Sequence, residues 1–105
     1  EEDALGELLE ILEQVSSYDK RIMITHAPPF ELRDLTKRGH AGSRAIREAY
    51  ERAEPLALVC GHIHESAGKE KNVLNVGEFR KGFYGVLETK EKLEKLELRN
   101  YSESI

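Results

Sequence analysis

The sequence has few cysteines and no long apolar run, which limits the cross-links that it can form and excludes a membrane-spanning helix. It has a single cysteine, Cys60, so it cannot form a disulfide within itself. Because Cys60 lies inside an apolar run, we expect a small buried hydrophobe rather than a reactive thiol. The longest apolar run, residues 56–60, is far too short to cross a bilayer. The sequence therefore predicts neither an internal covalent cross-link nor a membrane span.

An excess of basic residues is also lacking. The 105 residues carry a net charge of −4, which gives no support for general binding to nucleic acid or to a membrane surface. The first three residues are acidic and no methionine precedes them. This start differs from a signal peptide, and it is typical of a chain that is trimmed, cut from a longer polypeptide or freed from a tag. We expect a cytoplasmic location.

The composition that remains, 39% apolar and 34% charged, is that of one globular domain, residues 1–105. Apolar periodicity predicts, in chain order, a helix over residues 3–15, a buried strand over 22–25, a helix over 43–53 and a buried strand over 56–60. The first helix is expected to break at residues 16–19, and two prolines make residues 27–42 a long connection without regular structure. This alternation indicates parallel strands joined by a right-handed crossover.

The second half of the chain changes character. A turn is predicted at residues 66–70, followed by strands over 72–76, 83–88 and 93–98. Residues 90–99 are ambiguous, because their lysines and glutamates also favour a helix. We expect an α/β fold with one mixed sheet, its first two strands parallel and the later ones antiparallel, and with the helices on one face.

Both predicted parallel strands end in histidine. His26 follows the first strand, and His62 and His64 follow the second, one residue apart. If the backbone stays extended past Gly61, His62 and His64 project to the same side, and the carboxyl ends of parallel strands share one edge of the sheet. Imidazole is a common ligand of transition metals, so these three histidines are candidate metal ligands. The alternative is that one histidine caps a turn and another is solvated.

A second candidate site lies at the start of the helix over residues 43–53. Residues 39–43 combine two glycines with His40 and end at Ser43, the expected N-cap. Free backbone N–H groups at a helix start bind anions, so His40 and Ser43 are candidates for contact with a substrate phosphate. An ordinary glycine-rich loop with an N-cap is the alternative.

Four motifs give the sequence a resemblance to a known family. They are ITHAPP at residues 24–29, GHAGS at 39–43, CGHIHE at 60–65 and NVG at 75–77. In order, spacing and strand context they resemble the carboxy-terminal half of a calcineurin-like metallophosphoesterase, and the resemblance covers residues 20–88. It implies one half of the family's four-layer α/β/β/α sandwich. Residues 1–19 would be a leading helix and residues 89–105 a terminal hairpin or tail.

The resemblance also implies a chemistry. It implies a metal-dependent phosphoesterase that hydrolyses phosphomonoesters or phosphodiesters at a dinuclear centre. A complete site would hold two divalent transition metal ions, from among manganese, iron, nickel and zinc. In the family pattern the positions of His26 and His62 bind one metal, and the position of His64 binds the other.

The family's amino-terminal motifs are absent from the sequence. They are an Asp-x-His, a Gly-Asp-x-x-Asp with a bridging aspartate, and a Gly-Asn-His whose histidine serves as the general acid, so no catalytic residue is assigned here. We expect the chain alone to be inactive. Besides a phosphate ester substrate, the expected partner is a second copy, packed on the sheet face away from the helices, or a complementary amino-terminal fragment. The alternative is a non-catalytic metal-binding or structural half-domain that assembles with a partner.

Overall fold

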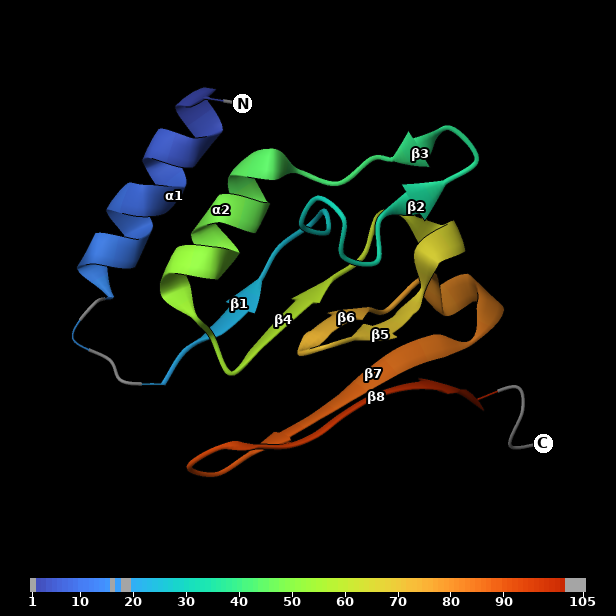
Figure 1. Ribbon diagram of the computed structural model, residues 1–105. Helices are drawn as coiled ribbons and strands as arrows, with labels where there is room; N and C mark the ends of the chain where they lie inside the picture. The colour runs from blue at the N-terminus through green and yellow to red at the C-terminus, as the bar shows by residue number, and fades with distance from the viewer. Residues whose placement is uncertain (1, 16, 18–19, 102–105) are drawn as a thin grey trace.

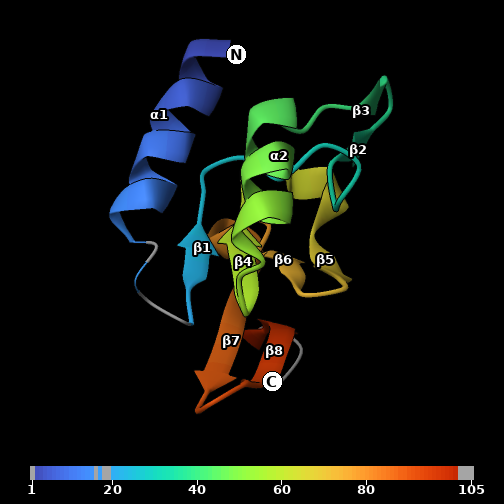
Figure 2. The ribbon, with the colours of Figure 1, turned by 60° about the vertical axis from the view of Figure 1, so that its left-hand side comes forward.

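The computed structural model describes residues 2–15, 17 and 20–101, and arranges them in three layers (Figure 1). Two helices lie on one side of a four-stranded sheet, and a long hairpin lies on the other side (Figure 2). The helices are α1 (Glu2–Gln14) and α2 (Arg44–Ala53). The strands are β1 (Ile22–Ile24), β2 (Leu35–Thr36), β3 (Gly39–His40), β4 (Ala57–Cys60), β5 (Gly68–Glu70), β6 (Val73–Asn75), β7 (Phe83–Thr89) and β8 (Leu93–Asn100). Two 3₁₀ turns, η1 (His64–Ser66) and η2 (Phe79–Lys81), complete the described elements.

The central sheet has the strand order β1-β4-β6-β5. β4 pairs in parallel with β1 on one side and with β6 on the other, and β5 pairs antiparallel with β6. The predicted α/β class, with a mixed sheet and helices on one face, is confirmed. The expected antiparallel attachment of the strand at Val73 is wrong, because β6 runs parallel to β4. The turn expected at residues 66–70 is instead η1 followed by the edge strand β5.

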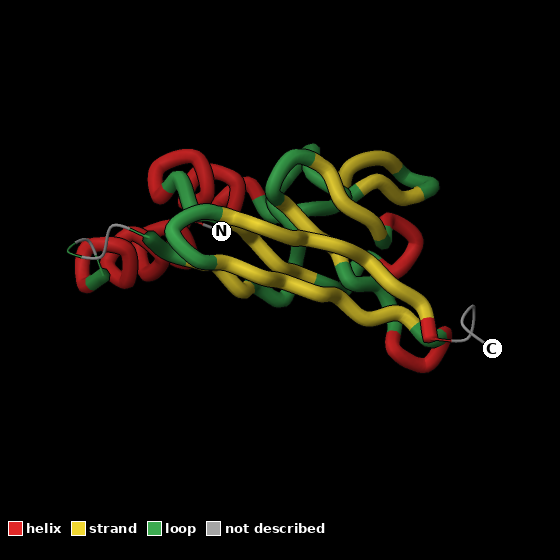
Figure 3. Tube along the Cα trace, turned by 90° about the horizontal axis from the view of Figure 1, so that it is seen from below, coloured by secondary structure: helices red, strands yellow, loops and turns green. Residues whose placement is uncertain are grey.

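The hairpin of β7 and β8 forms a sheet of its own, so the expectation of one continuous sheet is wrong. Seen from below, its two long strands cross the molecule on the side away from the helices (Figure 3). Residues 93–100 are strand and not helix, which resolves the ambiguity of this segment. Gly85 allows β7 to lie close against β6, because a Cβ at this position would be only 2.7 Å from Leu74 Cδ2.

Each face of the central sheet is covered by one apolar cluster, because successive residues of β4 point to opposite sides. On the helix side, Leu58 and Cys60 pack with Ile46 and Tyr50 of α2. On the hairpin side, Ala57 and Leu74 pack with Leu96, and further apolar side chains of β8 surround them. The expectation that the face away from the helices lies open is therefore wrong over β4 and β6.

The helices and the lone cysteine largely follow the sequence predictions. α1 begins and ends within one residue of its expected bounds, and its expected break at residues 16–19 falls mostly outside the described residues. Ser43 caps α2, its hydroxyl accepting a hydrogen bond from the Ile46 amide. Cys60 is buried, and burial raises the pKa of its thiol to about 12, as expected of a packed and unreactive side chain. Within the part of the chain that the structure describes, no helix has the length and apolar character needed to span a membrane.

Two further expectations fail. The apolar run of β1 predicts a buried strand, but β1 is an edge strand with exposed isoleucines. The connection over residues 27–42 contains the small hairpin of β2 and β3 and folds back against α2, where Pro29 forms an isolated bridge with Ser43. The loop is thus a packed element that begins one residue after His26 and ends where α2 starts.

Candidate functional site

The carboxyl ends of β1 and β4 bring two histidines together. His26 follows β1 by two residues and His62 follows β4 by two residues, and the Gly61 amide donates a hydrogen bond of 3.1 Å to the His26 carbonyl. The centroids of the two imidazole rings are 4.6 Å apart, and the ring planes are tilted by 41°. The prediction that adjacent parallel strands place these residues side by side is confirmed.

The backbone does not stay extended past Gly61. His62 has a φ of 65°, and the Ile63 amide donates a hydrogen bond of 2.7 Å to the Gly61 carbonyl, so the chain turns sharply at His62. His64 then opens the η1 turn. The expected projection of His62 and His64 to the same side by strand alternation is therefore wrong. His64 Nδ1 instead lies 3.4 Å from Glu78 Oε2.

A positive φ at a residue with a Cβ is costly, and such strain is concentrated at functional sites. We expect His62→Gly to be more stable than His62→Ala by about 1 kcal/mol, because glycine adopts this conformation without steric penalty. Urea unfolding of the two variants measures the difference. The same pair of substitutions at His64, where the turn is 3₁₀, should give the opposite order. Equal stabilities at position 62 would show that the turn is unstrained.

The histidines form part of a metal site and not a whole one. Metal-to-nitrogen distances are about 2.0–2.1 Å for zinc, so two imidazoles whose centroids are 4.6 Å apart fit two ligands of a single ion. His26 and His62 are both solvent-exposed, which leaves them open to further ligands. Among residues 2–15, 17 and 20–101, however, no three His, Cys, Asp or Glu side chains are grouped so that they could hold a metal ion. The described chain offers two ligands in one place, with His64 apart from them.

The start of α2 differs from the expected anion site. The Ser43 amide donates to the Pro28 carbonyl, and the Gly42 amide donates to Asp34 Oδ2. The Ile46 amide is bound by the Ser43 hydroxyl. The expectation of free backbone donors is therefore wrong at Gly42 and Ser43, which hold the preceding loop in place.

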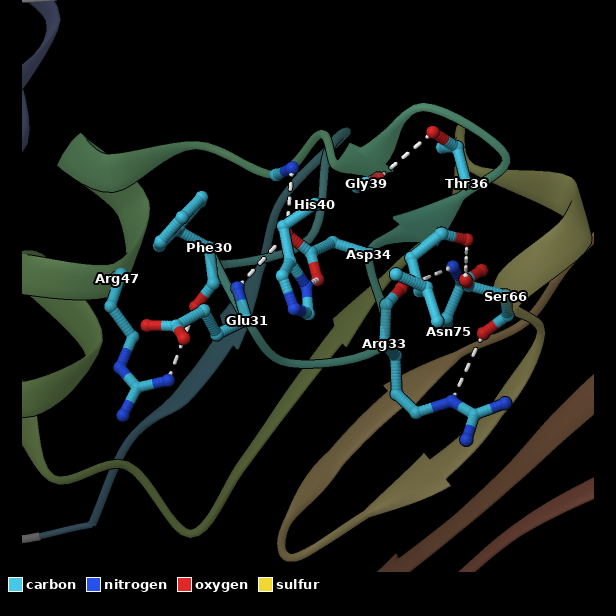
Figure 4. A network of polar contacts seen from close by, with 12 residues as sticks. Phe30, Glu31, Arg33, Asp34, Thr36, Gly39, His40, Arg47, Ser66 and Asn75 are labelled. Atoms are coloured by element: carbon cyan, nitrogen blue, oxygen red, sulfur yellow. Dashed lines mark hydrogen bonds and ion pairs between the residues drawn. The ribbon is translucent and has the colours of Figure 1, made fainter.

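His40 has a buried partner instead. Its Nδ1 lies 2.7 Å from Asp34 Oδ1, and the Asp34 side chain is 1% exposed (Figure 4). Asp34 Oδ2 also accepts hydrogen bonds from the amides of Glu31 and Gly42. Phe30 also contacts His40. Its ring meets the His40 ring edge-on, and the Arg44 guanidinium lies over the Phe30 ring. His40 is thus fixed in orientation, while its side chain stays 40% exposed.

The ionisation of this pair follows from its contacts. Burial alone would raise the pKa of Asp34, but the hydrogen bonds from His40 and from the two backbone amides outweigh burial, and the pKa is lowered. The hydrogen bond to Asp34 is the largest cause of the raised pKa of His40, and the charges of Glu31 and Glu70 add to it. Each partner therefore favours the charged form of the other.

The buried side-chain amide of Asn75 links the loops that follow β1 and β4. The sequence alone did not predict this role. The Asn75 Nδ2 group donates to the carbonyls of Ile63 and Arg33, at 2.9 and 3.1 Å, and Oδ1 accepts from the Gly77 amide. Figure 4 shows Asn75 beside Arg33 and Ser66. Arg33 in turn donates to the carbonyls of Ser66 and Ala67. An asparagine two residues before a glycine at the end of a buried strand was the available signal.

Comparisons with known proteins assign the fold and no family. No protein-family model matches the sequence. One crystal structure matches with a TM-score of 0.73 and 26% identity, over 92% of this chain and 40% of the solved chain. A probable rhamnogalacturonate lyase C of Emericella nidulans is 44% identical over 54 residues, which are 50% of this chain and 5% of the lyase. This chain therefore spans less than half of the solved chain and a small part of the lyase, and its arrangement of elements occurs within a longer solved protein.

Proposed function

We propose that this chain contributes histidine ligands to the metal centre of a divalent-metal phosphoesterase. The observation that carries the proposal is the pairing of His26 and His62 at adjacent parallel strand ends, with their ring centroids 4.6 Å apart. Solvent-exposed imidazoles so close together have little value for packing and suit a shared cation. The four motifs that resemble calcineurin-like metallophosphoesterases favour phosphate ester hydrolysis over other metal chemistry.

In this proposal His26 and His62 hold one divalent ion, and His64 serves a second ion once further ligands join it. Bound there, a manganese, iron, nickel or zinc ion neutralises negative charge on the phosphoryl oxygens. His40 stands with its Nδ1 on Asp34, so its other ring nitrogen is the one available to a substrate phosphate. Ser43 contributes by capping α2 and holding the loop that carries His40. Phosphomonoesters and phosphodiesters are both candidate substrates.

A non-catalytic metal-binding or structural half-domain is the second candidate. It is favoured by the small number of ligands that the described residues bring together, two imidazoles and no carboxylate beside them. On this view the chain needs a partner for either metal affinity or turnover. The similarity to the lyase covers only 5% of that protein, so it carries no proposal for an activity on rhamnogalacturonate.

Metal affinity tests the central assignment. We expect the purified chain to bind one zinc ion weakly, and His26→Ala and His62→Ala each to lower that affinity at least about tenfold, because each removes one of two ligands. Isothermal titration with zinc measures it. His40→Ala is the matched control, since His40 Nδ1 is held on Asp34 and, among the described residues, His40 forms no three-ligand group with the pair; the zinc affinity of this variant should be unchanged.

The same samples test the need for further ligands. Hydrolysis of bis(p-nitrophenyl) phosphate with manganese present should be undetectable with the chain alone, because the described residues place no carboxylate with the two histidines to bridge two ions. Unchanged zinc affinity in either single variant would contradict the ligand assignment. Robust hydrolysis by the chain alone would contradict the incomplete centre.

A further inference from the structure

The outer edge of β1 is the most exposed apolar feature of the central sheet. β1 is the terminal strand of the order β1-β4-β6-β5, and no described strand pairs with its outer side. Its two isoleucines are exposed, Ile24 by 81% and Ile22 by 38%. The strand carries no charge, proline or bulge, which are the devices that natural proteins use to protect such an edge.

The backbone of these isoleucines also faces outward. The Thr25 amide donates to the Val59 carbonyl, and β1 pairs with β4 in the register Ile24 to Val59. In a parallel ladder alternate residues bond to the same neighbour, so Met23 and Thr25 face β4. The N–H and C=O groups of Ile22 and Ile24 consequently point away from the sheet, as donors and acceptors for another strand.

A groove runs beside this edge under α1. Its volume is roughly 370 Å³, and its walls come from α1, β1 and the alanines of α2. Leu8, Ile11 and Leu12 of α1 line it, and Ile11 is still 54% exposed. Figure 2 shows α1 further out than β1, on the side away from β4. Neighbouring strands lie about 4.8 Å apart, so a strand beside β1 would lie beneath the apolar side of α1.

The two ends of this edge differ in charge. Lys20 and Arg21 line the groove where β1 begins. Glu7 lines the adjoining hollow at the other end, together with Ile24 and His26. A segment with an acidic side chain beside Lys20 therefore has charge complementarity in one orientation and meets Glu7 in the other.

We propose that the edge of β1 and the groove under α1 receive an extended, mostly apolar polypeptide segment from outside these 105 residues, added as a further strand with its acidic end beside Lys20. Backbone hydrogen bonds to Ile22 and Ile24 supply affinity, and side chains entering the groove at every second position supply specificity. The solved chain with this fold is more than twice as long, so additional chain accompanies the same arrangement there.

A second copy of this chain fits the edge less well. Two β1 strands paired across a twofold axis would place both α1 helices on the same side of one continuous sheet. Packed helices need about 8–10 Å between axes, whereas paired strands are about 4.8 Å apart. The helix that overhangs each edge would then collide with its symmetry mate.

Synthetic peptides test the proposal without any metal. One peptide alternates valine and threonine and starts with two glutamates; the matched peptide starts with two lysines. Adding the acidic peptide to the isotope-labelled chain should slow amide hydrogen exchange at Ile22 and Ile24 at least about tenfold, because those amides enter a ladder. The basic peptide should bind at least about tenfold more weakly.

Variants then locate the binding. Ile24→Lys should weaken acidic-peptide binding at least about tenfold without lowering the thermal midpoint, since that side chain is exposed. Phe79→Lys, at another highly exposed apolar residue that does not line the groove, should bind as the unaltered chain does. Equal binding by Ile24→Lys, no protection at millimolar peptide, or a doubled mass that Ile24→Lys reverses would each overturn the proposal. None of these readouts depends on zinc, so the proposed metal site stands or falls separately.

Discussion

Replacement of Asn75 by alanine is expected to lower the free energy of unfolding by about 3–5 kcal/mol. The side chain is fully buried and makes three hydrogen bonds, to the Ile63 and Arg33 carbonyls and from the Gly77 amide. Alanine leaves those three groups without this partner, one in a buried and two in part-buried surroundings, and each costs about 1–3 kcal/mol when left unsatisfied. Urea unfolding followed by circular dichroism measures the loss.

The loss should extend beyond stability. Ile63 follows His62 directly, so its carbonyl is one anchor of the turn that carries the imidazole. We therefore expect Asn75→Ala to weaken zinc binding as well. Asn100→Ala is the control, because the Asn100 side chain donates an exposed hydrogen bond to the Lys81 carbonyl and its removal should cost less than about 1 kcal/mol. A loss at Asn75 no larger than that at Asn100 would contradict the bracing role.

The features predicted from the sequence are those that local patterns determine. Ser43 caps α2 because a hydroxyl just before a helix can accept a hydrogen bond from a backbone amide of the first turn, two or three residues later, which has no partner within the helix. His26 and His62 come together because two apolar runs, each ending in histidine, form adjacent parallel strands. In both cases the sequence contains the cause within a few residues, or the topology allows few alternatives.

The features that escaped prediction depend on contacts between distant segments. An apolar triplet such as Ile22-Met23-Ile24 forms a strand at the centre or at the edge of a sheet, and only the set of neighbours decides its exposure. For residues 93–98 the sequence predicts a strand but leaves a helix open, and the apolar burial that favours the strand at Leu93, Leu96 and Leu98 comes from the sheet face above them. His62 leaves the extended path because the turn is closed by Gly61 and braced through Asn75, 13 positions later.

The Asp34 carboxylate shows the same limit for the candidate site. Its residue type and its place in a polar loop favour a solvated side chain, yet it is almost fully buried. Three donors make its burial possible. The Glu31 amide lies three residues before Asp34, and the His40 ring and the Gly42 amide lie six and eight residues after it. This spacing follows neither helix nor strand periodicity. The sequence therefore predicts His40 as a phosphate contact but does not predict its contact with Asp34.

The pair of Asp34 and His40 predicts how stability varies with pH. The folded pKa of His40 is raised from its usual 6.5, so its stabilising contribution is fully present below pH 6.5 and is lost as the pH rises through the folded value. The folded pKa of Asp34 is lowered from 3.8, so its contribution is present above pH 3.8 and is lost as the pH falls through the folded value. Both contributions are therefore complete between those two usual values.

Substitution of Asp34 by alanine should remove this dependence and cost about 3 kcal/mol at pH 6, because it leaves two loop amides and the His40 ring without their acceptor. Unfolding by urea at intervals from pH 5 to 9 measures both effects. His40→Gln is the matched variant, since it keeps the hydrogen bonds that the Glu31 and Gly42 amides donate to Asp34. It should lose the decline in stability above pH 6.5 while keeping most of the stability at pH 8. If the unaltered chain and His40→Gln showed the same pH profile, the raised pKa of His40 would not contribute to folding, and its bond to Asp34 would serve only to orient the ring.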